Sequence, residues 1–423
     1  MPRIPLGRAT AISELILQQL RTTPGVNWAE PVGSLRRGHD LIDDLALLAS
    51  TDDPSDLLDA LESFEGVQGV HQRGPDIAHI AVERVQVAIR CAAPSHAGSA
   101  LLQLTGSAAH VERLSALAEE RRLRLDANGL QRDHELIAAT EEEIYAALGL
   151  AFVPPELRAG DEEIELAIAG RLPALVTRAD IRGDLHMHSH WSDGRDSIED
   201  MVAQSVALGY EYVAITDHST NSAASRNLSL DDVERQHREI TALREQYPQI
   251  VILHGAEVDI LADGRLDFPD EVLRRFDIVL ASLHDRAGQS PRALLQRYER
   301  AMHHPLVSLV THPMNRPGPE RSGYDLDVDR LFELAATTGT ALEIDGAPSH
   351  LDLESSLARR AVQAGVMLSI DSDAHRTEML SRHMSLGLLT ARRGWVEPQH
   401  VLNVRPYADL MEFLSRKRSG TAQ

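Results

Sequence analysis

The second half of the chain contains seven short apolar segments that each lead into a histidine or a carboxylate. Their lengths are those of buried strands. Helical patterns separate them and carry start and stop signals, such as Ser290-Pro291, Ser229 and Gly365. Such alternation predicts a parallel α/β barrel, in which functional side chains lie at the carboxyl ends of the strands. The predicted strands are 184–188, 212–216, 250–257, 277–282, 306–311, 340–344 and 366–370.

The polar residues at these strand ends have the spacing of metal ligands. His186 and His188 are two residues apart, so on an extended strand they share one face, and Asp373 and His375 repeat this spacing. Asp371 is an alternative to Asp373, which we prefer because it lies beside His375. A histidine and carboxylate set suits zinc, manganese or iron rather than calcium. Nine candidates result: His186, His188, Asp193, His218, Glu257, His284, His312, Asp373 and His375.

The motifs around these residues resemble a known family. HMHSHWSDG, TDHS, GAEVDI, SLH, THP and DSDAH are similar to the PHP (polymerase and histidinol phosphatase) family. The resemblance covers about residues 180–415 and is strongest to the C-terminal PHP domain of bacterial family X DNA polymerases. It implies an α/β fold, a distorted (β/α)7 barrel, which agrees with the seven strands expected from the sequence.

The resemblance also implies three divalent transition metals (Mn, Zn or Fe). One ion would take His186, His188, Glu257 and Asp373, which would be the catalytic residues. A second ion would share Glu257 and add His284 and His312, and a third would take Asp193, His218 and His375. Such ions supply a hydroxide nucleophile and neutralise charge on a phosphoryl oxygen, which predicts hydrolysis of phosphate esters.

Other residues near these motifs have weaker expected roles. Arg226, Arg286 and Arg316 follow ligand-bearing segments and could clamp a substrate phosphate. His254 precedes Glu257 and could support a ligand. His190 has no ligand role in the family that these motifs resemble, and we expect three further histidines to be surface or capping residues: His303, His304 and His350.

The first half has a different pattern. GSLRRG (33–38) followed by an acidic strand, and TGSAAH (105–110), resemble the palm and thumb of family X polymerases. We expect an α+β nucleotidyltransferase-like palm and thumb remnant over residues 1–178, and the PHP barrel over 179–423. The predicted strands of this palm and thumb remnant are 26–31, 44–49, 76–83 and 85–91, and helical segments follow to about residue 169.

The palm-like segment departs from the family pattern at its metal ligands. The family palm needs three aspartates to hold two magnesium ions. Asp44 aligns with the first, but Ala46 and Ala88 stand where the other two belong. Asp43 is a poor substitute, because successive strand residues point to opposite faces. We therefore expect polymerase activity to be lost. The family's N-terminal lyase and helix-hairpin-helix regions are also expected to be missing.

Composition narrows the functions that remain. The formal net charge of -22 argues against nonspecific wrapping of nucleic acid. Lys417 is the only lysine and Cys91 the only cysteine, so lysine-nucleophile chemistry and internal disulfides are excluded. With no apolar stretch long enough to span a membrane and no signal-peptide pattern, we expect a cytoplasmic protein.

Three functions are compatible with these features. The favoured one is a metal-dependent phosphodiesterase, a 3′-5′ exonuclease or other hydrolase that processes DNA 3′ ends, with Arg36 and Arg37 contacting DNA phosphates. The alternative is a phosphomonoesterase of the histidinol-phosphatase type that acts on a small metabolite or nucleotide. A non-enzymatic module that binds DNA ends is disfavoured by the complete set of nine ligands. Protein partners are left open by the sequence.

Overall fold

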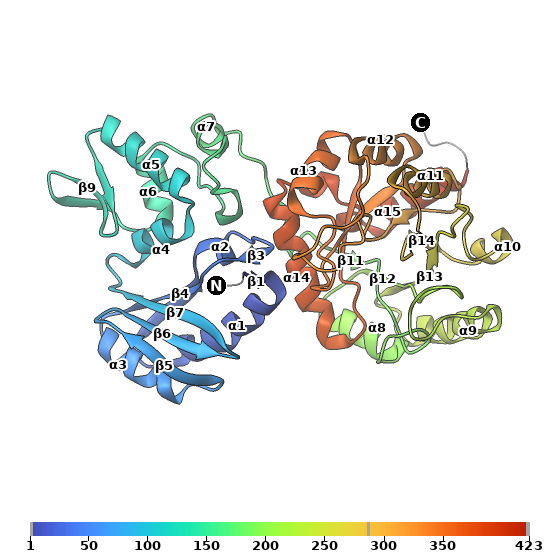
Figure 1. The fold of residues 1–423 in the computed structure, drawn as a ribbon, viewed down its shortest axis with the longest axis horizontal. Helices are drawn as coiled ribbons and strands as arrows, with labels where there is room; N and C mark the ends of the chain where they lie inside the picture. The colour runs from blue at the N-terminus through green and yellow to red at the C-terminus, as the bar shows by residue number, and fades with distance from the viewer. Residues whose placement is uncertain (1–2, 286–287, 420–423) are drawn as a thin grey trace. The chain divides into compact units, whose positions relative to one another are not determined.

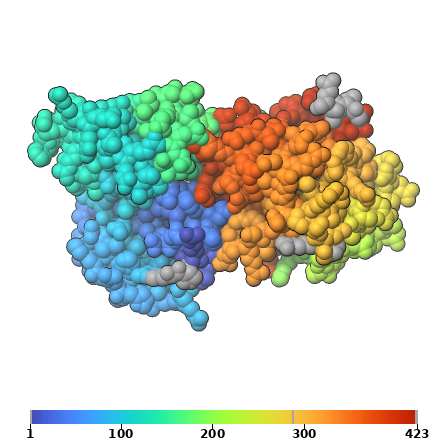
Figure 2. Space-filling view, turned by 45° about the horizontal axis from the view of Figure 1, so that its top comes forward, coloured from blue at the N-terminus to red at the C-terminus, as the bar shows by residue number. Residues whose placement is uncertain are grey.

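The computed structural model describes residues 3–285 and 288–419, and the chain divides into two compact units, Met1–Pro173 and Ala174–Gln423. Each unit is built from one continuous stretch of chain, so blue to green segments gather in one and green to red segments in the other (Figures 1 and 2). The boundary expected near residue 178 stays a prediction. Among the described residues, no helix is both long and apolar enough to cross a membrane.

Unit 2 is built on a seven-stranded sheet in which every strand is parallel to its neighbours and the spatial order follows the chain. A parallel bridge between Met187 and Ala374 links the two ends of the sheet, so it forms a nearly closed barrel. The predicted (β/α)7 architecture is confirmed. The strands are β11 (Gly183–Asp184), β12 (Tyr212–Ile215), β13 (Val251–Asp259), β14 (Ile278–Ser282), β15 (Leu309–Val310), β16 (Ala341–Asp345) and β17 (Leu368–Asp371).

Helices cover the outside of this barrel, and their start signals are those expected. Ser229 caps its helix together with Asp232 in a capping box, and Ser290 caps its helix ahead of Pro291. Gly365 has φ +80°, which ends the preceding helix in the left-handed region. The helices are α8 (Ile198–Ala207), α9 (Leu230–Gln246), α10 (Asp270–Leu273), α11 (Pro291–Met302), α12 (Val328–Thr338), α13 (Ser355–Gln363), α14 (Thr377–Arg393) and α15 (Tyr407–Arg418).

The amino ends of the strands are closed by an apolar cluster. Tyr212, Ile278 and Leu309, which begin their strands, pack with Leu410 and Leu414 of α15. Apolar side chains therefore fill the bottom of the barrel. The titratable side chains lie at the carboxyl ends of the strands, as in other parallel barrels.

Lys417, on α15, is only 8% exposed and donates a hydrogen bond to Thr340. Burial lowers its pKa from 10.5 to about 7, so between these values the unfolded chain holds a proton that the folded chain lacks. This makes folding costly at pH 7, and the cost is lost as pH rises toward 10.5. We expect Lys417→Met to raise the free energy of unfolding by up to about 4 kcal/mol at pH 7. At pH 9 this increase in the free energy of unfolding should be about half as large. Urea unfolding at pH 7 and pH 9 measures both increases, and equal increases at the two pH values would contradict this prediction.

Unit 1 begins with a five-stranded sheet in the order β2-β4-β7-β6-β5, in which β4 and β7 are parallel and the other pairs antiparallel. The four strands expected from the sequence are present, and β5 was not anticipated. The strands are β2 (Val26–Pro31), β4 (Leu45–Thr51), β5 (Val67–Arg73), β6 (Ile77–Val82) and β7 (Val85–Ala92); a further pair, β1 (Ile4–Pro5) and β3 (Leu41–Ile42), lies apart. Helices α1 (Leu6–Thr22), α2 (Gly33–Arg36) and α3 (Pro54–Ala60) accompany them.

The rest of unit 1 is a thumb-like region of helices and one small sheet. Its helices are α4 (Ala97–Thr105), α5 (Ala108–Glu120), α6 (Glu141–Ala147) and α7 (Glu163–Ile168). The expectation of continuous helical segments to residue 169 is wrong for 124–138, which form the antiparallel strands β8 (Arg124–Asp126), β9 (Gly129–Arg132) and β10 (Glu135–Ala138). These strands are too short and too polar to show an alternating pattern.

Candidate metal centre

The two histidines after β11 point to the same place. His186 and His188 are fully buried, and their Nε2 atoms lie 3.1 Å apart. Asp373, which follows β17, places Oδ1 3.1 Å from Nε2 of His188 and 3.7 Å from Nε2 of His186. These three residues form one of the donor groups that could hold a metal ion. Asp371 is directed elsewhere, since its Oδ1 accepts a hydrogen bond from the backbone of Leu185.

Glu257 lies at the middle of the histidine cluster. Its carboxylate comes from β13, is fully buried, and has five imidazoles within 3.6 Å. Oε2 lies 2.9 Å from Nδ1 of His218, and Oε1 lies 2.9 Å from Nε2 of His312. The remaining distances are 3.5 Å to His186, 3.6 Å to His188 and 3.5 Å to His284. Two oxygens with different partners are what a bridging carboxylate requires.

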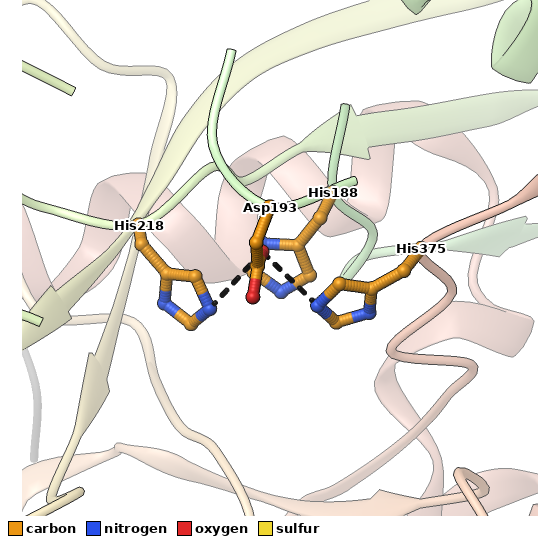
Figure 3. Close-up of side chains that lie close together, drawn as sticks. All are labelled: His188, Asp193, His218 and His375. Carbon is orange, nitrogen blue, oxygen red and sulfur yellow. Dashed lines mark ion pairs between the residues drawn. The ribbon is translucent and has the colours of Figure 1, made fainter. Parts of the chain in front are cut away.

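A second group surrounds Asp193 at the open side of the cluster. Asp193 Oδ1 lies 3.2 Å from Nε2 of His375 and 3.6 Å from Nε2 of His218 (Figure 3). His188 belongs to the same donor group, although the sequence assigned it only to the first ion. All nine predicted ligands therefore lie in one cluster, while their roles as ligands remain predictions.

The electrostatics of the cluster suit cations. Burial alone would raise the pKa of Glu257 and Asp373, but the surrounding histidines outweigh it and hold both values well below their usual range. Burial alone would lower the pKa of His312 and His375, but nearby carboxylates raise both to about 9. His188 is the exception, because burial and the positive charges of His375 and His218 lower its pKa to about 4. Without metal, protons take the place of cations between these groups.

Two carboxylates that the sequence analysis missed hold the imidazoles in place. Glu343 Oε1 lies 2.7 Å from Nδ1 of His186, and Glu343 Oε2 accepts a hydrogen bond from the backbone N–H of His312. Asp259 Oδ1 lies 3.0 Å from Nδ1 of His284. Carboxylates behind ligating histidines orient the rings and increase their basicity. The available signal was an acidic residue inside an apolar strand, as in ALEID.

The donor set fits metal ions by a test independent of its spacing. Glu257 Oε2 and His312 Nδ1 are buried and have no hydrogen bond of acceptable geometry within the described part of the chain. His312 and Asp373 have φ of 25° and 45°, a region that non-glycine residues rarely adopt and that is enriched at functional sites. Buried polar atoms without partners are costly unless a ligand or ion satisfies them.

The cluster opens into a cavity of about 620 Å³. His350 and His383 line it together with most of the ligand candidates. The expectation that His350 is a surface or capping residue is wrong, because its ring stacks on that of His312 with centroids 4.9 Å apart. His254 does not support a ligand directly: its side chain contacts Gln236 and His237 of α9.

Two of the three arginines expected to clamp phosphate in unit 2 have other contacts. Arg316 is buried and donates hydrogen bonds to the carbonyls of Leu351 and Pro319, so its position does not support phosphate binding. Arg226 donates to the carbonyl of His190 from an exposed position, where phosphate binding remains a prediction. Arg286 lies outside the described residues.

Arg36 and Arg37, expected to contact DNA phosphate, bind within unit 1. Arg36 makes two hydrogen bonds of 2.8 Å to Glu141, and Arg37 donates to the carbonyl of Thr105. Glu141 also pairs with the fully buried Arg158. These contacts are structural, which argues against a role for either arginine in DNA binding.

We expect Glu141→Gln to destabilise unit 1 by about 3–5 kcal/mol, because two largely buried guanidinium groups lose their counter-charge. Urea unfolding followed by circular dichroism measures the change. Glu142→Gln is the matched control, since Glu142 is exposed on the same helix. Equal stability of the two variants would show that the buried pair contributes nothing.

The palm-like sheet places the two alanines side by side. Ala46 on β4 and Ala88 on β7 are register partners in the parallel pair. Ala46 packs against a small apolar cluster of Val32, Leu48 and Leu101. Asp44 is exposed just before β4, and Asp43 pairs with Arg3 at 2.7 Å. Of the three expected positions, only the first therefore carries a carboxylate, and Asp43 does not replace a missing one.

Comparison with known proteins agrees with both halves of the chain. Residues 100–159 match the DNA polymerase beta thumb family and residues 184–345 match the PHP domain family. The DNA polymerase/3′-5′ exonuclease PolX of Bacillus subtilis (strain 168) is 35% identical over 98% of this chain and 73% of its own length. The chain belongs to the bacterial PolX family.

The chain is also similar to shorter proteins, over about half of its length. A probable phosphatase of Syntrophotalea carbinolica is 29% identical over 55% of this chain and 95% of its own length. A probable phosphatase of Edwardsiella ictaluri is 30% identical over 55% of this chain and 94% of its own. The family and the donor clusters identify the chain as a metal-dependent phosphoesterase.

Proposed function

We propose that this PolX protein hydrolyses phosphodiester bonds at DNA 3′ ends, as a 3′-5′ exonuclease or related 3′-end-processing hydrolase that has lost polymerase activity. The observation that carries the proposal is the Glu257 carboxylate surrounded by five imidazoles within 3.6 Å. The PolX relative, named as both a polymerase and a 3′-5′ exonuclease, supports DNA as the substrate.

The residues would divide among three divalent ions of manganese, zinc or iron. His186, His188 and Asp373 would hold the first, His284 and His312 the second, and Glu257 would bridge the two. Asp193, His218 and His375 would hold the third at the open side of the cavity. When bound, such ions supply a hydroxide nucleophile and stabilise charge on the phosphoryl group.

The side chains of this chain supply the rest of the chemistry. Glu343 and Asp259 orient His186 and His284 through hydrogen bonds of 2.7 and 3.0 Å. Cys91 and Lys417 are poor candidates for a nucleophile, because burial raises the pKa of Cys91 to about 12 and Lys417 is buried on α15. The nine ligand candidates would hold the ions that supply an activated water.

The alternative function is hydrolysis of a phosphomonoester. It is favoured by the probable phosphatases, which match over about half of this chain and nearly their whole own length, and by a cavity of about 620 Å³, which is of the size that holds small molecules. Both functions would place the substrate phosphate at the same ions. They differ in the group that is esterified to this phosphate, which is a DNA strand in one case and a small molecule in the other.

One experiment separates these functions. The purified chain with Mn²⁺ is tested on single-stranded DNA labelled so that nucleotides released from the 3′ end are counted, on duplex DNA, and on a chromogenic phosphomonoester. We expect release of nucleotides from 3′ ends and slow monoester hydrolysis. Rapid monoester hydrolysis with intact DNA would establish the alternative and overturn the proposal.

A further inference from the structure

A further group of metal donors lies beside the proposed centre. Asp345, His350 and Asp373 each offer one ligand atom, and these atoms all lie within 4.8 Å of one another. Asp345 ends β16, His350 lies in the loop that follows, and Asp373 follows β17. Asp345 and His350 are outside the nine ligands expected from the sequence.

Asp345 presents an unsatisfied oxygen to this group. The residue is fully buried, and its Oδ1 accepts a hydrogen bond of 2.6 Å from the backbone of Ala347. Its Oδ2 has no hydrogen bond to any described residue. Glu343 lies on the same strand, and Asp373 is part of the same group, so several carboxylates converge here. A buried carboxylate oxygen beside other carboxylates is costly unless a proton or a cation neutralises it.

His350 is oriented as a ligating histidine. Its Nδ1 lies 3.1 Å from the carbonyl oxygen of Arg316, to which it can donate. This bond fixes the tautomer and leaves the Nε2 lone pair for another partner. Metal-ligating histidines commonly donate their second nitrogen to a backbone carbonyl in this way. The ring also stacks on His312 at an angle of 18°, which limits its rotation.

The loop that carries His350 is fixed at both sides. Arg316 donates from its guanidinium to the carbonyl of Leu351, and Asp352 accepts a hydrogen bond from the backbone of Met314. Asp352 in turn forms a bridge with Asp345 through backbone hydrogen bonds. Arg316, expected to bind phosphate, therefore holds the segment that brings His350 to Asp345.

We propose that Asp345, His350 and Asp373 form a fourth divalent-cation position, which shares Asp373 with the ion at His186 and His188. Two carboxylates and one imidazole suit Mn²⁺ or Zn²⁺. His350 and Asp373 line the cavity, so an ion held there would be reachable from the cavity. The inference rests on the proposed function through Asp373, which would bridge two ions as is proposed for Glu257.

Metal counting tests this proposal without any activity assay. The full chain is stripped with chelator, dialysed against excess Mn²⁺ and analysed for bound metal by elemental analysis. We expect four ions in the parent chain and three in Asp345→Asn and His350→Gln. The matched control is His383→Gln: His383 is buried, lies 2.8 Å from the Ser372 carbonyl through Nδ1 and lines the same cavity, but belongs to none of the donor groups found among the described residues. This control should retain four.

The outcomes distinguish this proposal from the proposed function. Three ions in the parent chain and three in both variants would overturn the fourth position and leave the three-ion centre intact. Fewer than one ion in the folded parent chain would overturn the metal centre itself. An Asp345→Asn chain that fails to fold leaves the decision to His350→Gln, and four ions in that variant would overturn the proposal.

Discussion

Replacing Glu257 with glutamine is expected to reduce phosphate ester hydrolysis by about 10³-fold or more and to remove metal from two positions at once. The side chain keeps its size, but an amide offers one neutral oxygen where the carboxylate offers two charged ones. Ions of this kind provide several kcal/mol of transition-state stabilisation, and each tenfold in rate is worth about 1.4 kcal/mol. Initial rates on a labelled 3′ end and elemental analysis of the same preparation measure the two effects.

Two controls show whether the effect belongs to the bridging position. Asp193→Asn changes a residue expected to serve one ion, so it should cost less activity and less metal than Glu257→Gln. Glu333→Gln changes an exposed glutamate on α12 that pairs with Arg330, and it should behave as the parent chain. If Glu257→Gln bound as much metal as Asp193→Asn did, the bridging assignment would be wrong.

The barrel and the positions of its ligands were predictable because both leave local signals. Most of the buried strands are apolar runs, and most ligand candidates lie at or just after the end of a run; Glu257 lies near the end of β13, in GAEVDI. Parallel topology then brings the strand ends together. The nine residues could thus be placed in one cluster from the sequence, although a pattern of single residues cannot show which oxygen of Glu257 faces which ring.

Partners that are distant in the chain could not be predicted. Arg36 and Glu141 are 105 residues apart in the chain but form an ion pair in the folded protein. The sequence alone could not show this pairing, so Arg36 was predicted to be an exposed phosphate contact. Arg316 and His350 are linked across 34 residues by the carbonyl of one and the ring of the other. Glu343 faces into the barrel from an apolar strand, and only the closed sheet places it behind His186. Such roles depend on tertiary contacts that leave no local pattern.

The unmodified chain is expected to show no template-directed primer extension with either Mg²⁺ or Mn²⁺. Two-metal catalysis needs carboxylates on both neighbouring strands, and Ala46 and Ala88 occupy facing positions in that pair. Alanine offers no ligand atom, and the exposed Asp44 is left to hold the ions alone. Extension of a labelled primer on a template, resolved on a sequencing gel, measures the activity, with the Bacillus subtilis PolX relative as the positive control.

Restoring aspartate at both positions tests the reason for the loss. Because Ala46 and Ala88 are register partners, Ala46→Asp with Ala88→Asp would place two carboxylates beside each other, and binding of Mn²⁺ to unit 1 should become detectable by titration. Ala46→Asn with Ala88→Asn is the matched control, since it adds similar volume without charge. The side chain at position 46 packs against the apolar cluster of Val32, Leu48 and Leu101. A polar side chain there is costly, so we expect a lower free energy of unfolding for unit 1 in both double variants. Primer extension by the unmodified chain at a rate near that of the relative would show that the palm does not depend on these two positions.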